Sequence, residues 1–349
     1  DPGWRITLQD QGMYRLTYAE LQDAGFPVTS VDPDTIKLYH QGEEMAILIT
    51  GNGDESFDSG EAILFYGEAI QNKYTDENVY WLTHGGGDGL RISPRAAAPA
   101  SGAVSPSFSS LEAFEENHVY LTKMVGDDDF ERYAWDQIYT SDSSYSKSYT
   151  FHLEAPVAGT AANLQLWLYG HLSKSANPDH HASISLNGTS LGETWWDGFT
   201  SQLFDVTIPA DVLETGDNTL TVMGLNDLGV GIVYFLVDRF EIAYQSAFQA
   251  QGDTLTFTED DPGTWQFEVG GFSSDQVSAF DVSDPHAVVP IADVSVTGTS
   301  APYTLAFEET LAEARTYWTG TQDAYQSVSE ITLDTPSSWG TASKGADYI

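Results

Sequence analysis

The sequence predicts an all-β fold in which an N-terminal β domain, a jelly-roll β-sandwich and an immunoglobulin-like β-sandwich follow one another in tandem. The 349-residue chain consists of short β-branched, aromatic and aliphatic runs separated by Gly, Asp, Asn and Pro. Several runs alternate apolar and polar residues, which is typical of strands with one buried face. A single short segment, Thr17 to Gly25, combines a capping Thr, a Glu three residues later and a terminal Gly, and predicts a helix.

The N-terminal domain is expected to occupy residues 1–95, where five strand-like runs follow one another: YRLTY, TIKLYH, MAILIT, AILFYG and NVYWLTH. Residues 96–112 are rich in Pro, Ala and Ser and have no apolar period, so they are expected to form a linker.

The jelly-roll domain is expected at residues 113–247, because its strand-like runs are separated by turn residues at intervals that suit two packed sheets. Within it, the run HASISLNG places Ala182, Ile184 and Leu186 on one face, and the Asn187-Gly188 pair predicts a hairpin turn.

A further series of short strands predicts the immunoglobulin-like sandwich at residues 251–334. Residues 335–349 are expected to be a linker followed by ADYI, the first strand of a further domain.

The composition excludes several classes of partner. The net charge of −39 comes from 52 acidic and 13 basic residues, and such a charge repels nucleic acids and anionic lipids. No apolar run reaches the roughly 18 residues that insertion into a bilayer requires. The charge attracts cations, and it favours either solubility in an extracellular or salty setting or specific divalent-metal sites. The absence of cysteine excludes disulfides, thiolate nucleophiles and cysteine-ligated zinc in this chain.

A cluster of carboxylates lies between two apolar runs, in the segment TGNGDESFDSGE. An EF-hand or dockerin-type calcium loop needs oxygen ligands at its first, third, fifth, ninth and twelfth places and a backbone carbonyl at the seventh. Counted from Thr50, the third, fifth, seventh, ninth and twelfth places are held by Asn52, Asp54, Ser56, Asp58 and Glu61. We therefore expect these five residues to bind Ca²⁺, with Ser56 acting through its carbonyl oxygen.

An ordinary solvated hairpin turn is the alternative interpretation of this acidic segment. Thr50 stands where the calcium pattern has Asp, and Glu55 stands where it has the Gly of a sharp turn. The flanking runs look like strands, whereas the EF-hand loop is flanked by helices. The sequence leaves both interpretations open.

The middle block offers histidine and tryptophan residues as further candidate sites. His180 and His181 are adjacent, so in a strand they point to opposite faces and do not easily share one ion. His152 and His171 have no spacing that requires them to join, so a polar sheet edge is favoured over zinc. Trp195 and Trp196 offer rings that could stack on a sugar if exposed, although burial is the commoner fate of Trp in a sandwich.

Several phrases resemble one known family. The sequence contains, in this order, the runs GMYRLTYAELQDAGFPV, DPDTIKLYHQGEEMAILITGNGDESFDSGEAILFYGE, PDHHASISLNG, WWDG, VSAFDVSDP and ADYI. In this order they resemble the N-terminal region of secreted gingipain-type, caspase-like cysteine peptidases. In that family an ADYI-like strand opens the catalytic domain, so the resemblance implies that the catalytic His and Cys lie beyond Ile349.

The resemblance implies a non-catalytic, prodomain-like or docking region of a secreted or cell-surface peptidase, and the acidic segment adds the expectation that calcium stabilises it. The chain itself is not expected to be an enzyme, because it has no Cys and no alternative catalytic triad in its sequence. Its expected partners are a downstream protease domain or neighbouring copies of the chain. The alternative is an extracellular structural or adhesive protein that self-assembles or binds glycans.

Overall fold

The chain is built from β-sheets, as predicted, and most of their strand pairs are antiparallel. The computed structural model describes residues 3–51, 56–70, 74–121 and 132–334. Strands account for 55% of the structure and helices for 4%, which confirms the all-β class. The described residues form two compact units: unit 1 lies within Asp1–Val104 and Ala250–Ile349, and unit 2 spans Ser105–Gln249.

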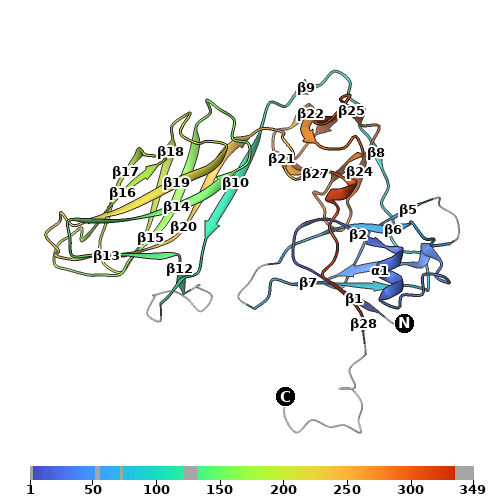
Figure 1. Cartoon of the computed structure of the whole chain (residues 1–349), viewed down its shortest axis with the longest axis horizontal. Coiled ribbons are helices and arrows are strands. Elements are labelled where there is room, and N and C mark those ends of the chain that lie inside the picture. The colour runs from blue at the N-terminus through green and yellow to red at the C-terminus, as the bar shows by residue number, and fades with distance from the viewer. Residues whose placement is uncertain (1–2, 52–55, 71–73, 122–131, 335–349) are drawn as a thin grey trace, which may run out of the picture. The chain divides into compact units, whose positions relative to one another are not determined.

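Unit 1 contains four sheets and the predicted helix (Figure 1). Its helical elements are α1 (Tyr18–Asp23) and the 3-10 turns η1 (Pro33–Thr35) and η2 (Gln322–Ala324). Its N-terminal strands are β1 (Trp4–Leu8), β2 (Gly12–Thr17), β3 (Lys37–His40), β4 (Glu43–Met45), β5 (Leu48–Thr50), β6 (Ala62–Gly67), β7 (Asn78–Thr83), β8 (Arg95–Ala96) and β9 (Ala103–Val104). Its C-terminal strands are β21 (Thr254–Glu259), β22 (Gly263–Phe272), β23 (Val277–Asp281), β24 (Val289–Ala292), β25 (Ser295–Thr297), β26 (Tyr303–Leu311), β27 (Arg315–Thr321) and β28 (Glu330–Leu333).

Helix α1 begins where the sequence predicts it. The Thr17 hydroxyl accepts a hydrogen bond from the Glu20 backbone N–H at 3.2 Å, and the Glu20 carboxylate accepts one from the Thr17 N–H at 2.7 Å. This reciprocal pair satisfies two donors that the first turn of a helix leaves open. Leu21 is the fully buried residue of the helix and packs into the core between the first sheets. Among the described residues, no helix has the length and apolar composition needed to cross a bilayer.

The N-terminal and C-terminal blocks of unit 1 are interlocked, which differs from the predicted tandem arrangement. Strand β1 lies between β7 and the C-terminal strand β28 in the sheet order β28-β1-β7-β3-β4. A shared core brings Met13 and Tyr66 of the first block against Phe280 and Trp318 of the second. The physical reason is that the open edge of β1 needs a partner, and local sequence pattern does not specify which distant strand supplies it.

The predicted linker at residues 96–112 also differs, because much of it pairs with neighbouring strands. Strand β8 lies parallel to β24, and β9 lies parallel to β22. Strand β10 (Phe108–Glu115) joins the sandwich of unit 2 through β20 (Val233–Ser246). These strands show no apolar period because most of their side chains are exposed, and backbone hydrogen bonds hold them in place.

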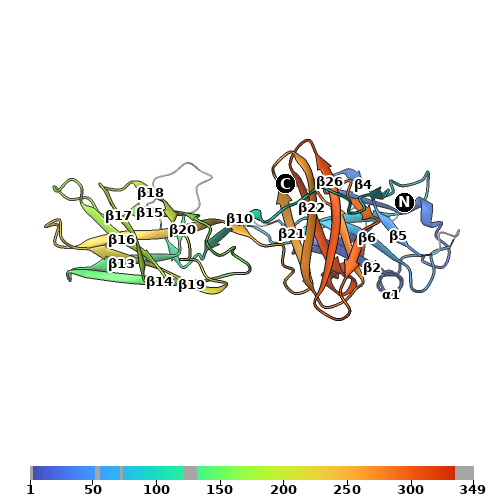
Figure 2. The same cartoon turned by 90° about the horizontal axis from the view of Figure 1, so that it is seen from above.

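In the part of unit 2 that the structure describes, two sheets form a sandwich, and β11 and β12 pair in a separate two-stranded sheet. One sheet has the order β10-β20-β15-β18 with β13 also paired to β20, and the other has the order β14-β19-β16-β17. The long strands β14, β19 and β20 run along the length of the unit (Figures 1 and 2). The remaining bounds are β11 (Val119–Tyr120), β12 (Tyr133–Ala134), β13 (Asp136–Thr140), β14 (Ser144–Leu153), β15 (Ala162–Gly170), β16 (His180–Leu186), β17 (Thr189–Trp196), β18 (Ser201–Ile208) and β19 (Gly216–Leu225).

Alternation along the strands builds the core of unit 2. Ala182, Ile184 and Leu186 of β16 are all buried on one face, as the pattern predicts. They pack with inward-facing residues of the opposite sheet, such as Leu164. The predicted Asn187-Gly188 turn joins β16 to β17, and both residues have positive φ, 50° and 78°, as a two-residue hairpin turn requires.

Candidate functional site

The acidic segment is the connection of a β-hairpin. Strands β5 and β6 pair antiparallel, with Thr50 opposite Ala62, so strands flank the segment on both sides. Thr50 closes the hairpin, because its hydroxyl accepts a hydrogen bond from the Ala62 N–H at 3.0 Å. Of the five predicted calcium ligands, Asn52 and Asp54 lie outside the described residues.

The three described ligand candidates lie in one turn. The Glu61 carboxylate is buried and accepts a hydrogen bond from the Asp58 backbone N–H at 2.8 Å. The Ser56 hydroxyl donates to the Asp58 carboxylate at 3.1 Å. Gly51 has a φ of +137°, and a Cβ added there would lie 1.8 Å from a Glu61 carboxylate oxygen. The hairpin therefore folds closely around the Glu61 carboxylate, and calcium binding there stays a prediction.

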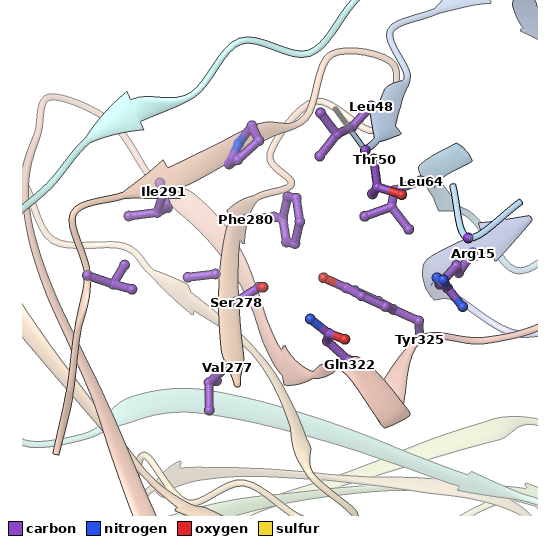
Figure 3. Close-up of a pocket in the computed structure, with 15 residues that line it drawn as sticks. Arg15, Leu48, Thr50, Leu64, Val277, Ser278, Phe280, Ile291, Gln322 and Tyr325 are labelled. Carbon is purple, nitrogen blue, oxygen red and sulfur yellow. The ribbon is translucent and has the colours of Figure 1, made fainter. Parts of the chain in front are cut away.

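A pocket of about 590 Å³ lies beside this hairpin in unit 1 (Figure 3). It is lined by Arg15 of β2, Leu48 of β5 and Phe280 of β23, with Tyr325 and Gln322 from the segment after β27. The Tyr325 ring stacks on Trp318 at 5.5 Å, and burial raises the pKa of its hydroxyl.

The pocket offers hydrogen-bonding groups and one cation, but the residues described as lining it include no histidine or carboxylate. General acid–base catalysis at neutral pH draws mostly on such groups. To a ligand, the lining presents the Arg15 guanidinium, the Gln322 amide and the Tyr325 hydroxyl.

The adjacent histidines of β16 face opposite sides of their sheet. His180 is fully buried, stacks on Trp196 at 4.9 Å, and donates from Nε2 to the backbone carbonyls of Leu172 and Gly198 at 3.1 and 3.2 Å. Burial lowers the pKa of His180, so this imidazole is a neutral part of the core.

His181 lies on the other face and supports Trp195. The two rings stack at 4.4 Å. Carboxylates meet the two His181 nitrogens from opposite sides, Asp227 at Nδ1 (2.9 Å) and Glu193 at Nε2 (3.3 Å). A single ion cannot bridge groups placed this way, but Trp195 is 47% exposed and its ring is stacked on His181. The arrangement suits an apolar sugar face with hydroxyls near the carboxylates.

His152 and His171 of unit 2 lie in different surroundings. His152 is exposed and pairs with Asp217 at 2.9 Å, and that hydrogen bond raises its pKa. His171 packs edge-on against Tyr234 at 4.7 Å, and burial lowers its pKa.

One cluster in unit 1 carried no recognisable sequence signal. His40, Glu68 and His286 bring three ligand atoms within 4.8 Å of one another. The two histidines are 246 residues apart, so no local spacing pattern could have joined them.

Comparisons with known proteins show the fold. No family model matches the sequence, and no curated protein sequence matches it. Among solved structures, the chain resembles dimeric latent PorU from Porphyromonas gingivalis, with a TM-score of 0.69 at 15% identity; the match covers 96% of this chain and 33% of that chain. The extracellular domain of ANXUR2 from Arabidopsis thaliana matches with a TM-score of 0.26 at 9% identity, covering 70% of this chain and 83% of that chain. This similarity is too low to support a conclusion about the fold or function. The chain thus spans about a third of the length of PorU, and at this identity the likeness is one of fold.

Proposed function

We propose that this chain is a non-catalytic region of a secreted, gingipain-like cysteine peptidase, with a prodomain-like or docking role toward the peptidase domain. The observation that carries the proposal is the fold match, which extends over 96% of the chain with a TM-score of 0.69. PorU is a gingipain-like cysteine peptidase, and the sequence phrases resemble the same class. Both the phrase order and the backbone geometry support the proposal.

The composition and the pocket are in keeping with a supporting role. The chain contains no cysteine, so the thiolate of such a peptidase must come from another segment. The pocket beside the acidic hairpin offers Arg15 and Tyr325 as binding groups. Calcium bound by the hairpin is part of this proposal, and it would hold β5 and β6 together.

The test separates the chain from the peptidase domain. The reading frame is inspected for a caspase-like domain with His and Cys, and that domain is produced alone and mixed with this chain. We expect the chain alone to cleave no Arg or Lys reporter peptide, and the mixture to show binding by calorimetry together with a changed melting temperature or activity of the peptidase domain. Reporter cleavage by the chain alone, or a mixture indistinguishable from its parts in 0.15 M salt, contradicts the proposal.

A second candidate function, glycan binding by unit 2, is favoured by one observation. Trp195 is exposed, and its ring is fixed by stacking on His181 between two carboxylates. An adhesive surface module would use such a platform, because a rigid aromatic ring contributes contact area at a low entropic cost.

A further inference from the structure

We propose that His40, Glu68 and His286 form a binding site for a divalent transition metal of the zinc class. The three side chains come from separate segments of unit 1: the end of β3, the residue after β6, and the turn between β23 and β24. Among the described residues this is the one group of three or more such side chains whose ligand atoms all lie within 4.8 Å of one another. The site does not depend on the proposed peptidase role or on the acidic hairpin.

The separations match the spacing of ligands around one ion. His40 Nδ1 lies 3.2 Å from His286 Nε2 and 3.6 Å from Glu68 Oε2. A tetrahedral zinc ion with bonds of about 2.0–2.1 Å holds its ligand atoms about 3.3 Å apart. These two separations therefore allow coordination without a large rearrangement, and all three ligand atoms lie within 4.8 Å of one another.

The tautomer of His40 is fixed by its surroundings. Its Nε2 lies 3.1 Å from the Asn78 side-chain oxygen. That amide is itself oriented, because its nitrogen donates to the Glu68 carbonyl at 2.8 Å and its oxygen accepts from the Val79 N–H at 3.0 Å. The proton of His40 is therefore on Nε2, and Nδ1 presents a lone pair to the cluster.

The ring of His40 is held rigidly in this position. His40 is 2% exposed, and its ring stacks on Tyr80 at 4.3 Å with 10° between the planes. Locking of a metal-binding imidazole by a hydrogen bond to its second nitrogen is a regular feature of protein metal sites, since it orients the lone pair.

His286 has a corresponding support. Its Nδ1 lies 3.5 Å from the Glu43 carboxylate, which favours the proton on Nδ1 and leaves Nε2 to face His40. Two lone pairs and the Glu68 carboxylate then converge, and such a group is repulsive unless a cation lies between them. The net charge of −39 raises the local concentration of cations around the chain.

The donor set selects the class of metal. Two imidazoles and one carboxylate suit Zn²⁺ and similar transition metals, whereas Ca²⁺ and Mg²⁺ prefer all-oxygen sites. The side chains of Glu68 and His286 are 39% and 27% exposed, so water can fill a fourth position. The bound ion would fasten the N-terminal and C-terminal blocks of unit 1 beside the Ala46–His286 backbone hydrogen bond of 2.8 Å.

The test uses the full chain freed of metal by a chelator. Titration calorimetry with ZnCl₂ should show one tight site, and zinc should raise the melting temperature of unit 1 at matched ionic strength. Cobalt(II) should give the visible absorption of a tetrahedral nitrogen- and oxygen-ligated ion. His286→Gln and Glu68→Gln should each weaken the tight site by more than the 10–100-fold that loss of an outer-shell partner costs.

The control is His152→Gln, because His152 is an exposed histidine that also pairs with carboxylates, Asp217 and Glu154, but has no second histidine beside it. This variant should bind zinc as the unchanged chain does. His286 and Glu68 are chosen over the buried His40, and melting in EDTA verifies that each variant folds. Equal zinc affinity in all four proteins would overturn the proposal. So would a melting temperature that changes with pH but not with zinc.

Discussion

Glu61 and Trp195 show how single side chains acquire a functional geometry in this protein. The Glu61 carboxylate is buried against Gly51, where the Glu61 side chain itself leaves no room for a Cβ. Adjacent residues of a strand point to opposite faces. Trp195 therefore lies on the outer face of β17 and is exposed, whereas Trp196 lies on the inner face and is buried in the sandwich. One change at each position tests the role assigned to it.

At the acidic hairpin we expect Ca²⁺ to raise the melting temperature of unit 1, and Glu61→Gln to remove that increase. The amide oxygen of Gln can still accept the hydrogen bond from the Asp58 N–H, so the turn persists while the charge is lost. At 100 times its dissociation constant, calcium should stabilise by about 2.7 kcal/mol. Melts with calcium and with chelator measure this. Asp260→Asn serves as the control, because Asp260 is an exposed carboxylate between β21 and β22 of the same unit. Identical melts at matched ionic strength would refute the calcium site.

For glycan binding we expect Trp195→Ala to weaken the affinity of unit 2 for any oligosaccharide found on a glycan array by at least about tenfold, or 1.4 kcal/mol. Tyr139→Ala is the matched control, because Tyr139 is 54% exposed on another strand of the same unit. Calorimetry with the bound sugar provides the measurement. Equal losses in both variants, or no sugar bound at all, would exclude the Trp195 platform.

Between elements, a buried ionic network ties four strands of unit 1 together. Arg95 of β8 donates to both carboxylate oxygens of Glu309 on β26, at 2.8 and 2.7 Å, and to Asp281 of β23 at 2.8 Å. Arg315 of β27 donates to the same Asp281 oxygen. The side chains of Asp281 and Glu309 are 7% and 6% exposed, so their charges depend on these partners.

We expect Arg95→Met to lower the free energy of unfolding of unit 1 by about 3 kcal/mol at neutral pH, because the buried Glu309 carboxylate loses its bidentate partner and Asp281 keeps only the ion pair with Arg315. Arg5→Met is the control, since the Arg5–Glu330 pair is about half exposed and such pairs contribute at most about 1 kcal/mol. Urea unfolding measures both variants. Equal losses would mean that the network contributes no more than a surface ion pair.

The same network should give an acid dependence. Burial pushes the pKa of Asp281 upward, but hydrogen bonds from Ser283 and Arg95 and the charge of Arg315 outweigh it, and the pKa lies below its ordinary value. An unfolded Asp titrates near pH 4. The stabilisation by Asp281 is therefore fully present above that value and is lost as the pH falls through the lower folded pKa. The difference between the unchanged chain and Arg95→Met should shrink as unfolding is measured from pH 6 toward pH 3.5, and a constant difference would contradict this.

At the scale of the whole molecule, the chain folds as two units and not as three. We therefore expect two unfolding transitions. The blocks that the sequence places at residues 1–95 and 251–334 share sheets and a core within unit 1. Leu16→Ala and Leu305→Ala remove fully buried side chains from these two blocks, at a cost of about 2–5 kcal/mol each.

In scanning calorimetry we expect Leu16→Ala and Leu305→Ala to lower the same transition, and Leu166→Ala, in the core of unit 2, to lower the other. The reason is that cores built jointly by both blocks unfold cooperatively. Three transitions, with Leu16→Ala and Leu305→Ala acting on separate ones, would favour the tandem arrangement.

The sequence alone determined what depends on neighbouring residues. Alternation placed Ala182, Ile184 and Leu186 in a core, and the Thr17–Glu20 pair located the capping box of α1. The Asn-Gly pair predicted the hairpin turn at residues 187–188. These features follow from side-chain periodicity and from local backbone preferences, which act over a few residues.

The tertiary structure alone decided which distant segments meet. The alternation of residues along a strand shows which face is buried. The backbone edge of the strand can pair with any other strand edge, so the sequence could not predict that β1 pairs with β28. For the same reason His40 and His286 gave no signal: each is an isolated histidine in the sequence, and only the joint folding of the two blocks places their nitrogens 3.2 Å apart. A ligand set built from distant segments forms only when folding has overcome the loss of chain entropy that bringing those segments together requires.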